Sequence, residues 1–375
     1  MSRPPRSAAG GLRRVEVELG ERSYPVELGF ETLAAAGPEI ARRTGSRHAI
    51  VVTVPAVGWR YAPTLLRSLR GAGLRAERVD VPDGDAAKNL RQVARLYDAF
   101  VRRRADRATA VVALGGGMVG DLAGFAAASY LRGVPFVQVP TTVLAMVDAS
   151  IGGKVGVNLR QGKNLVGAFH QPRLVWIDVA TLKSLPRRQR AAGMAEVIKA
   201  AAIADAALFE RLERDAEALM ALDPQALLPV LERACAIKAE VVSRDEREGG
   251  QRMLLNFGHT LGHAIEQRHR YRKILHGEAV AIGMVFAAER SEALGLAPAG
   301  TAERIARLLR RVGLPTAVPP APRRAYLSAL RVDKKSRGSR IHFVVLRGIG
   351  TAGTLPLGPA EILPAGRRAR PRRTR

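Results

Sequence analysis

The sequence predicts an α/β domain with a doubly wound, mostly parallel sheet, followed by a mainly α-helical domain. Three observations lead to this prediction. The chain has 375 residues, enough for two domains of roughly 100–200 residues each. Apolar strand-like runs alternate with helical patterns in the first half, as in parallel sheets, and long helical patterns dominate the second half. Because ligands usually bind at the carboxyl ends of parallel strands and between domains, we expect the functional site in the interdomain cleft.

The first half alternates predicted strands with predicted helices. The strands are short apolar runs at 48–54, 78–81, 109–114 and 136–139. The helices cover 86–103 and 119–130, where apolar residues recur at helical spacing. A triple glycine, Gly115 to Gly117, joins the third strand to the second helix. This order predicts crossover connections between parallel strands.

The pattern changes near Leu185 and Pro186, where we place the domain boundary. Beyond it the sequence predicts helices at 190–203, 206–219, 225–244, 259–269 and 278–294, and one β-like run at 341–346. The basic, low-complexity ends, 1–14 and 366–375, are expected to be disordered. The α/β domain then covers 15–185 and the helical domain 186–365.

Composition excludes several classes of protein. Hydrophobic residues make up 47% and charged residues 25%, the mixture of a globular protein. No apolar run reaches the roughly 18–20 residues of a membrane span, and the N-terminus lacks the apolar core of a secretory signal. The single cysteine, Cys235, excludes a disulfide framework within the chain and suits a reducing compartment, so we expect a cytoplasmic protein.

The net charge of +26 invites a nucleic-acid interpretation, but the aromatic content of 5% shows no stripe interleaved with basic residues. An Arg-rich solvated surface explains the charge better. The basic residues comprise only nine Lys, against 51 Arg. A chain that uses Arg nearly everywhere is expected to keep Lys where a compact ammonium is needed.

Three glycine-rich segments suit anionic ligands. Gly115 to Gly120 fits G-x-G-x-x-G after a strand, although no acidic residue follows about twenty residues later as in the usual dinucleotide fingerprint. Asp148 to Lys154 and Gln161 to Asn164 each place a Lys beside a glycine turn, which suits a phosphate ester. One such turn alone is usually an ordinary surface loop; three within about fifty residues favour a binding site.

The second half contains a candidate metal site. Glu196 and Lys199 share a helix face, and His259 and His263 are four residues apart on another helix. Thr260 stands where the zincin motif needs Glu, so the pair is not a zincin site. Two His and one carboxylate with an open position form a common catalytic zinc set. His276 completes the set with Glu196 and His259, and His263 in its place is the alternative.

A series of motifs runs in order through about residues 80 to 350. These are Gly115–Asp121, Tyr130–Gly133, Val139–Thr142, Val147–Asp148, Gly152–Lys154, Gly162–Asn164, Gly167–Pro172, Ala195–Lys199, Leu255–His259, His276–Glu278 and Asp333–Lys335. In this combination the sequence resembles the 3-dehydroquinate synthase family of the sugar-phosphate cyclases. The combination is specific, although no single motif is.

The resemblance implies an N-terminal NAD-binding domain, a helical C-terminal domain, a homodimer and one divalent metal, usually zinc or cobalt. The implied metal ligands are Glu196, His259 and His276. The residues implied along NAD are Asp85, Lys88, Gly115, Gly116, Gly117, Val119, Asp121, Thr141, Thr142, Lys154, Lys163, Thr181, Ser184 and Leu185. Those implied around the substrate are Asp148, Lys154, Lys163, Asn164, Lys199, Lys238, Arg252, Asn256, His263 and one of Lys334 and Lys335. Arg132 would reach the site of the neighbouring subunit.

The implied reaction converts 3-deoxy-D-arabino-heptulosonate 7-phosphate into 3-dehydroquinate and phosphate, a step of the shikimate pathway of aromatic amino-acid biosynthesis. NAD would oxidise the C5 hydroxyl with the help of the metal as Lewis acid. Phosphate would then be eliminated, the hydride returned and the carbocycle closed by an intramolecular aldol reaction. Because NAD is regenerated, the net reaction is that of a lyase.

The sequence departs from the family pattern at a few positions. Val54 and Ala56 stand where the family often has Asp and Asn to hold the adenosine ribose, so the mode of adenosine binding is open. Met146 and Val155 replace a frequent Gln and a frequent Thr beside the site loops, with modest effects expected on packing.

Two alternatives remain. Sister cyclases act on sedoheptulose 7-phosphate or glucose 6-phosphate, which lack a carboxylate. The presence of Lys238, Arg252, Asn256 and Asp333–Lys335 favours a carboxylate-bearing substrate instead. A nucleic-acid-binding protein on an inactive cyclase scaffold would require a broken site, yet every expected ligand is present.

Overall fold

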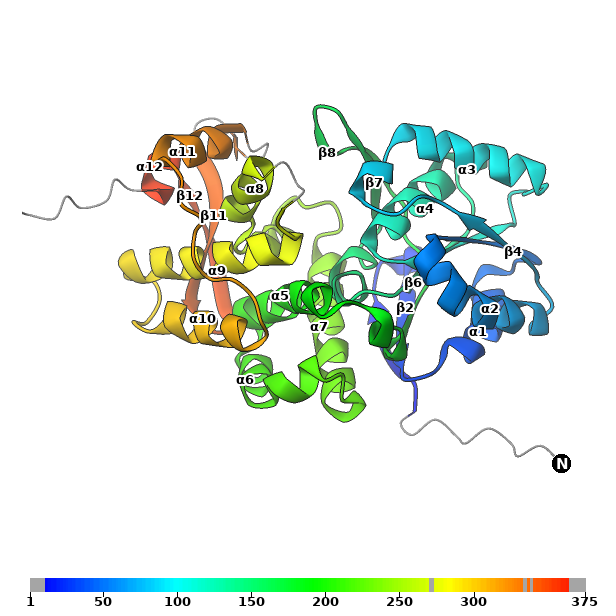
Figure 1. Ribbon diagram of the computed structural model, residues 1–375, viewed down its shortest axis with the longest axis horizontal. Coiled ribbons are helices and arrows are strands. Elements are labelled where there is room, and N and C mark those ends of the chain that lie inside the picture. Colours follow the sequence, from blue (N-terminus) through cyan, green and yellow to red (C-terminus); the bar gives the residue numbers. More distant parts are fainter. Residues whose placement is uncertain (1–10, 270–272, 333–335, 338–339, 364–375) are drawn as a thin grey trace, which may run out of the picture. The chain divides into compact units, whose positions relative to one another are not determined.

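The computed structural model describes residues 11–269, 273–332, 336–337 and 340–363 (Figure 1). Lys334 and Lys335, one of which is expected to face the substrate, lie outside the described residues, as do most of the two basic ends. The first strand begins at Arg13, inside the segment 1–14 that the sequence predicts to be disordered.

A seven-stranded sheet forms the centre of the α/β part, in the order β1-β2-β9-β6-β5-β3-β4. All neighbours pair in parallel except β1 and β2, which confirms the predicted mostly parallel sheet. The strands are β1 (Arg13–Val17), β2 (Tyr24–Gly29), β3 (His48–Thr53), β4 (Arg75–Asp80), β5 (Ala110–Gly115), β6 (Phe136–Pro140) and β9 (Leu174–Asp178). Strands β3, β4, β5 and β6 correspond to predicted strands, whereas β1, β2 and β9 have no predicted counterpart.

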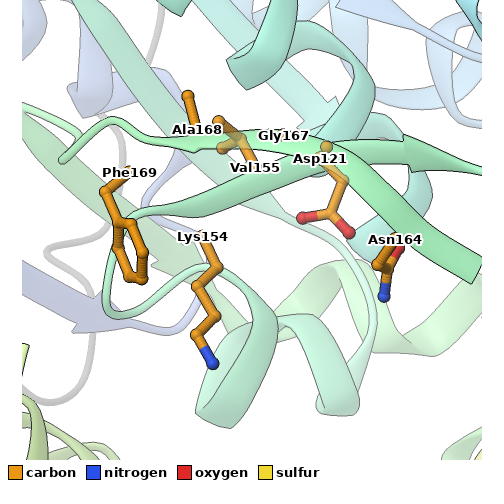
Figure 2. Close-up of a pocket in the computed structure, with 8 residues that line it drawn as sticks. Asp121, Lys154, Val155, Asn164, Gly167, Ala168 and Phe169 are labelled. Atoms are coloured by element: carbon orange, nitrogen blue, oxygen red, sulfur yellow. The ribbon is translucent and has the colours of Figure 1, made fainter. Parts of the chain in front are cut away.

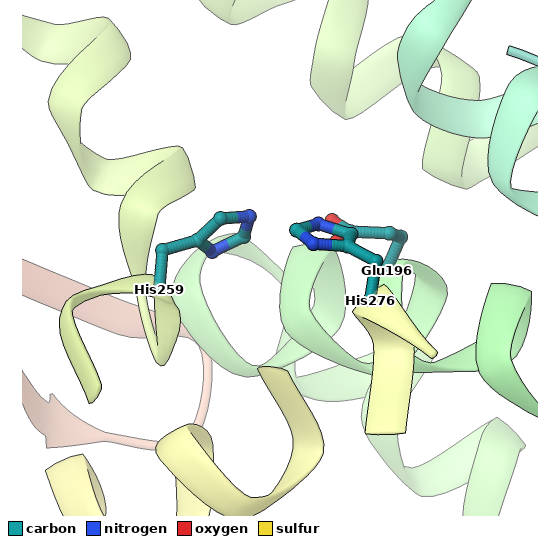
Figure 3. Close-up of side chains that lie close together, drawn as sticks. All are labelled: Glu196, His259 and His276. Atoms are coloured by element: carbon teal, nitrogen blue, oxygen red, sulfur yellow. The ribbon is translucent and has the colours of Figure 1, made fainter. Parts of the chain in front are cut away.

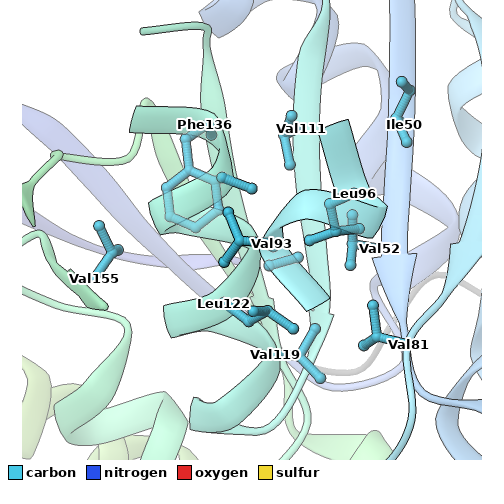
Figure 4. Close-up of a cluster of buried hydrophobic side chains, with 14 of the residues drawn as sticks. Ile50, Val52, Val81, Val93, Leu96, Val111, Val119, Leu122, Phe136 and Val155 are labelled. Carbon is cyan, nitrogen blue, oxygen red and sulfur yellow. The ribbon is translucent and has the colours of Figure 1, made fainter. Parts of the chain in front are cut away.

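Alternate residues of the central strands supply the two cores of the sheet, because neighbouring side chains point to opposite faces. Ile50 and Val52 of β3 pack with α3 (Leu90–Arg102) and α4 (Gly117–Ser129) on one face (Figure 4). Val51 of β3 packs on the other face with α1 (Ala36–Thr44) and α2 (Pro55–Gly71). Helices cover both faces, as a doubly wound sheet requires.

An antiparallel hairpin of β7 (Lys154–Leu159) and β8 (Gly162–Phe169) lies over α4. Its residues Val155 and Val157 belong to the same core as α4. The two lysine-containing glycine turns are therefore the two ends of one hairpin. Lys163 and Asn164, predicted in a glycine turn that suits an anionic ligand, are the second and third residues of strand β8.

The predicted helices 190–203, 206–219 and 225–244 are α5 (Arg187–Ala204), α6 (Ala206–Met220) and α7 (Pro224–Arg244). Helix α7 packs against β1, β2 and the segment Ala145–Ala149. Contacts divide the chain into two units: residues up to Ala200 together with Glu210–Arg252, and Ala201–Phe209 together with the chain from Met253. The first unit thus includes α7 with the sheet, whereas the boundary near 185 stays a prediction.

The second unit is mainly helical. It contains α8 (His259–Arg268), α9 (His276–Ala293), α10 (Thr301–Arg311), α11 (Arg323–Val332) and α12 (Pro359–Ile362). The late β-like run is β11 (Arg340–Gly348), which pairs with β10 (Ser336–Arg337) and β12 (Thr351–Leu357). Helices α8 and α9 approach each other closely: a Cβ at Gly283 would lie 1.9 Å from the Gly258 carbonyl oxygen.

No helix among the described residues is long and apolar enough to cross a membrane.

Candidate active site

The carboxyl end of β5 leads directly into the N-terminus of α4, where the three glycines lie. No described side chain caps this helix, so its first backbone N–H groups are available to an anion. A Cβ at Gly117 would lie 3.2 Å from the Ala149 Cβ, and one at Gly116 would lie 3.1 Å from the Thr142 Cγ2. A side chain at either position would therefore crowd the neighbouring segment 142–149. Val119 is buried in the core and can reach a ligand only through its backbone.

The hairpin forms one wall of a cavity of about 410 Å³ (Figure 2). Its polar lining residues are Asp121, Lys154 and Asn164, and its other lining residues are Val155, Gly156, Gly167, Ala168 and Phe169. Figure 2 shows Asp121 near Asn164 and Lys154 beside Phe169. The cavity thus joins a residue expected along NAD to residues expected around the substrate.

Lys88 contacts two of the polar residues that line this cavity, Asp121 and Asn164. Its Nζ lies 2.5 Å from the Asp121 Oδ2 and also contacts the Asn164 Oδ1. Lys163 pairs with Asp85, with 3.0 Å between Nζ and Oδ2. Burial raises the pKa of the Asp121 carboxyl, and the Lys88 ammonium opposes that rise. The structure thus brings together Asp85, Lys88, Asp121, Lys163 and Asn164, which come from three separate segments of the sequence.

The remaining predicted NAD residues follow β6 and β9. The Thr141 N–H donates to the Gly115 carbonyl (2.9 Å), so the turns after β5 and β6 are joined. The buried Thr181 hydroxyl donates to the Asp178 carbonyl in the 3₁₀ segment η6 (Val179–Ser184). Tyr61 donates to the Ser184 Oγ (2.8 Å), and Leu185 follows η6. Direct contact of these residues with NAD stays a prediction.

A cluster of charged side chains includes Asp148 of the segment Ala145–Ala149 (η5), which forms a turn of π-helix. Such turns are frequent at functional sites. The Asp148 Oδ1 lies 2.5 Å from the Nζ of Lys238 on α7. Burial disfavours the ionised Asp148, but the ammonium groups of Lys238 and Lys199 outweigh it and hold the carboxyl pKa at about 2. Asp148 is therefore an anion at neutral pH.

Lys199 is buried on α5 and pairs with Glu196 one turn earlier. Burial lowers the pKa of the Lys199 ammonium, but the carboxylates of Glu196 and Asp148 raise it more. The cluster therefore combines two ammonium groups with two carboxylates in a largely buried environment. Such groups can hold hydroxyl and phosphate groups of a ligand in one orientation.

The loop after α7 carries Arg252. Asp245 ends the helix and accepts hydrogen bonds from the N–H groups of Gly249, Gly250 and Arg252 at 2.7–2.9 Å. The fully buried Arg252 guanidinium donates to the Glu246 carbonyl (2.5 Å) and, more weakly, to the Gly152 carbonyl (3.4 Å). Glu248 pairs with Lys154. Arg252 thus supports the glycine turn before β7, and its contact with a substrate stays a prediction.

The structure brings together Glu196, His259 and His276, whose ligand atoms all lie within 4.8 Å of one another (Figure 3). The alternative ligand His263 is not part of this group. The His259 Nδ1 lies 3.2 Å from the Phe257 carbonyl oxygen, and the His276 Nδ1 lies 3.2 Å from the Glu266 Oε2. If each Nδ1–H donates, each ring is the tautomer whose Nε2 carries the lone pair that can bind a metal. Two imidazoles and a carboxylate fit a zinc-type ion with an open position.

Three further predicted site residues are His263, Asn256 and Arg132. The His263 ring centroid lies 5.5 Å from that of His259 and 6.3 Å from that of His276. Asn256 ends the 3₁₀ segment η7 (Gln251–Asn256), three residues before His259. Arg132 lies in η4 (Tyr130–Arg132), where Leu131 and Arg132 have φ values of 49° and 68°. Such left-handed conformations are uncommon outside glycine and concentrate at functional sites.

Sequence reasoning missed several residues that support the site. Tyr24 on β2 accepts the Gly152 N–H (2.9 Å), and Asn158 on β7 contacts both Asp85 and Asn164. No sequence spacing connects these residues, so only the tertiary structure reveals them. Glu266 could have been found, because it lies three residues after His263 on the same predicted helix.

Two family models match most of the chain. The model described as 3-dehydroquinate synthase N-terminal matches residues 78–192, and the one described as 3-dehydroquinate synthase C-terminal matches residues 193–336. A 3-dehydroquinate synthase of Citrifermentans bemidjiense is 48% identical over 90% of this chain and 93% of its own. One of Pseudomonas aeruginosa is 47% identical over 94% of this chain and 96% of its own.

Two similar solved structures carry ligands. ValA of Streptomyces hygroscopicus, a 2-epi-5-epi-valiolone synthase with NAD+ and Zn2+ bound, has a TM-score of 0.83 and 32% identity, covering 92% of this chain and 96% of its own. A 2-deoxy-scyllo-inosose synthase complexed with carbaglucose-6-phosphate, NAD+ and Co2+ has a TM-score of 0.85 and 28% identity, covering 93% and 98%.

Proposed function

Since the chain belongs to the 3-dehydroquinate synthase family, it is a lyase that forms 3-dehydroquinate, and we propose which of its residues carry out each part of the reaction. The substrate is 3-deoxy-D-arabino-heptulosonate 7-phosphate, and the products are 3-dehydroquinate and phosphate. The observation that carries this conclusion is the match of both family models together with near-half identity to relatives of that name. The sister cyclases are less similar, at 32% and 28% identity.

The residues present fit both cofactors. When bound, NAD accepts and returns a hydride, and a divalent metal such as zinc or cobalt acts as a Lewis acid on a substrate hydroxyl. Glu196, His259 and His276 would hold the metal, because they are the described His and acidic side chains whose ligand atoms converge. The uncapped N-terminus of α4 would hold the NAD pyrophosphate. Asp85, Lys88, Asp121 and the turns after β6 and β9 would lie along the rest of NAD.

The lysines and their acidic partners would bind and orient the substrate. Lys154 and Asn164 line the cavity, and Lys163 lies beside Asn164 on β8, so these residues present an ammonium or amide group to an anionic ligand. Lys199, Lys238 and Asp148 form a preorganised set of donors and acceptors, because their charges balance together with that of Glu196 in the buried cluster. Holding one substrate conformer in this way lowers the entropic barrier to elimination and ring closure.

His263 and Asn256 would complete the substrate contacts, and one of Lys334 and Lys335 would join them. Arg252 would meet the substrate carboxylate, for which its guanidinium is well suited. The buried position of Arg252 suggests that the loop 245–252 moves when substrate binds. The leaving phosphate can take the C6 proton itself, so the chain need only hold the substrate in the right conformer.

The protein would act as a homodimer in the cytoplasm. Arg132 would reach the active site of the neighbouring subunit, and its left-handed backbone supports a functional rather than a packing role. The buried, unpaired Cys235 fits a reducing compartment.

The test is direct. The purified protein is incubated with NAD+, Zn2+ or Co2+ and 3-deoxy-D-arabino-heptulosonate 7-phosphate, while phosphate release and 3-dehydroquinate formation are followed. We expect both products, and we expect a chelator to abolish them. Phosphate release from sedoheptulose 7-phosphate alone would instead assign the chain to a sister cyclase. No product from either substrate would contradict catalysis altogether.

A further inference from the structure

Asn158 interrupts the ladder between β7 and β8. The register of the hairpin shifts between Val157 and Leu159, so Asn158 occupies a bulge. Its backbone N–H donates to the Lys88 carbonyl (2.8 Å) rather than across the hairpin. Bulges beside active sites commonly redirect a side chain. The bulge here attaches the hairpin to the loop that carries Asp85 and Lys88.

The Asn158 side chain makes one contact on each side. Its Oδ1 accepts the Asn164 N–H at 3.0 Å, and its Nδ2 donates to the Asp85 carbonyl at 3.4 Å. Asn164 has a φ of 52°, a left-handed conformation that is unfavourable for most residues other than glycine and tolerated best by Asn and Asp. The hydrogen bond from the Asn164 N–H to Asn158 therefore helps to stabilise this left-handed conformation of Asn164.

The two residues that Asn158 contacts belong to different halves of the site. Asp85 pairs with Lys163 and lies next to Lys88, which contacts both Asp121 and Asn164. Asp85, Lys88 and Asp121 are assigned to NAD, whereas Asn164 is assigned to the substrate. The contacts form a closed ring through Asp85, Lys88, Asn164 and Asn158. A movement of the loop 85–88 would therefore also shift Asn164.

We propose that Asn158 is a positioning residue that couples the NAD loop 85–88 to the substrate-binding residue Asn164. The inference rests on the proposed function, because that function assigns the two halves of the ring to two ligands. Asparagine suits the position since one short side chain offers both a donor and an acceptor. Leucine has nearly the same shape but offers neither, and aspartate at neutral pH offers only acceptors.

The experiment compares Asn158→Leu and Asn158→Asp as full-length, metal-loaded proteins. Titration calorimetry gives the Kd of NAD+ without substrate, and steady-state kinetics at saturating NAD+ gives the substrate KM and kcat. For Asn158→Leu we expect both the NAD+ Kd and the substrate KM to rise about fivefold to tenfold, the usual effect of losing one hydrogen bond.

For Asn158→Asp we expect the NAD+ Kd to rise while the substrate KM changes little. The carboxylate still accepts the Asn164 N–H, so the substrate KM should stay within about threefold of the wild-type value at about 0.2 M salt, where the added charge is screened. The donor to the Asp85 carbonyl is lost, so the NAD+ Kd should rise as in Asn158→Leu. A residue that merely stabilises the hairpin would not separate the two constants.

Gln161→Leu at the exposed tip of the same hairpin is the matched control, because it makes the same change from amide to leucine outside the ring. We expect it to leave both constants unchanged. The proposal is overturned if Asn158→Leu changes neither constant by more than about twofold, or if both Asn158 variants raise them equally. Failure of the wild-type protein to form 3-dehydroquinate would contradict the proposed function instead, and the NAD+ titration would still test the contact with Asp85.

Discussion

At the scale of single residues, the site is built from charged side chains that neutralise one another before any ligand binds. Lys88 pairs with Asp121, Lys238 with Asp148, and Lys199 with Glu196. Buried charges are tolerated only when they are paired in this way. These three lysines of an Arg-rich chain therefore occupy positions where a compact ammonium meets a carboxylate.

Glu266 should control the affinity of the metal through His276. The buried Glu266 carboxylate accepts from the His276 Nδ1 and so orients the ring. We expect Glu266→Ala to weaken zinc binding by about 10–100-fold and Glu266→Gln to weaken it less, since the amide oxygen still accepts. Competition with a chromogenic chelator measures the Kd. Glu289→Gln, an exposed change on the same helix as His276, is the control. Equal zinc affinities in all variants would show that Glu266 does not support the metal site.

Asp148 should give a defined acid dependence of stability. Its folded pKa of about 2 lies below the ordinary value of 3.8, so the ion pair with Lys238 stabilises the fold above that value and loses its effect as the pH falls towards 2. Asp148→Asn leaves Lys238 buried without its charge partner and should lower the free energy of unfolding by about 3 kcal/mol at neutral pH.

Urea unfolding of the metal-free and NAD-free protein at several pH values measures this difference between Asp148→Asn and the wild type. It should be constant above about pH 5 and shrink only below about pH 4, as the wild-type carboxylate takes up its proton. A difference that already shrinks near pH 6 would show that the lysines do not depress the pKa of Asp148.

At the scale of elements, the ends of strands and helices position the site. The N-terminus of α4 lies after β5, the π-turn η5 carries Asp148, and the β7–β8 hairpin forms the cavity wall. Helix α7 carries Lys238 and ends at Asp245, whose three backbone hydrogen bonds shape the following loop. These elements are rigid, so their ends can hold reactive groups in place.

Asp245→Ala should affect substrate binding more than stability. Without the carboxylate the loop 245–252 loses three hydrogen bonds, so Arg252 and Glu248 are no longer held near Gly152 and Lys154. We expect the substrate KM to rise about tenfold or more, with a small change in melting temperature. Steady-state kinetics and thermal unfolding measure the two effects.

The other end of the same helix provides the control. Asp223 caps the N-terminus of α7 by accepting the Gln225 N–H at 3.0 Å. Asp223→Ala should cost about 1 kcal/mol of stability and leave the substrate KM unchanged. If both variants alter KM equally, the effect belongs to the helix as a whole and not to the loop that Asp245 holds.

At the scale of the whole molecule, the proposed dimer can be tested by mixing two inactive variants. If Arg132 acts in the partner's site, Arg132→Ala and His276→Ala damage different components of each site. A heterodimer of the two variants contains one intact site. Unfolding and refolding an equal mixture of the two inactive variants should therefore restore about a quarter of the wild-type activity. No recovery in a mixture shown to contain heterodimers would place Arg132 in the site of its own subunit.

The sequence alone was sufficient for the fold class and the family, and it narrowed the candidate metal ligands to Glu196, His259 and either His276 or His263. The parallel strands β3, β5 and β6 are buried on both faces and therefore read as continuous apolar runs. Residue chemistry left both histidines possible, and the structure groups His276, not His263, with Glu196 and His259. Such features depend on residue type and local spacing, which the sequence states directly.

Strands β1 and β2 were missed because charged residues interrupt their apolar pattern, whereas β9 is an apolar run as long as β6 and could have been predicted. Only the tertiary structure decided which residues support the ligands. Asn158 and Tyr24 act through hydrogen bonds to groups that are distant in the sequence and that the chain topology brings close. The contact between Lys88 and Asn164 spans 76 residues, and that between Arg252 and Gly152 spans 100. Hydrogen bonds depend on distance and direction in space, so no local pattern in the sequence records them.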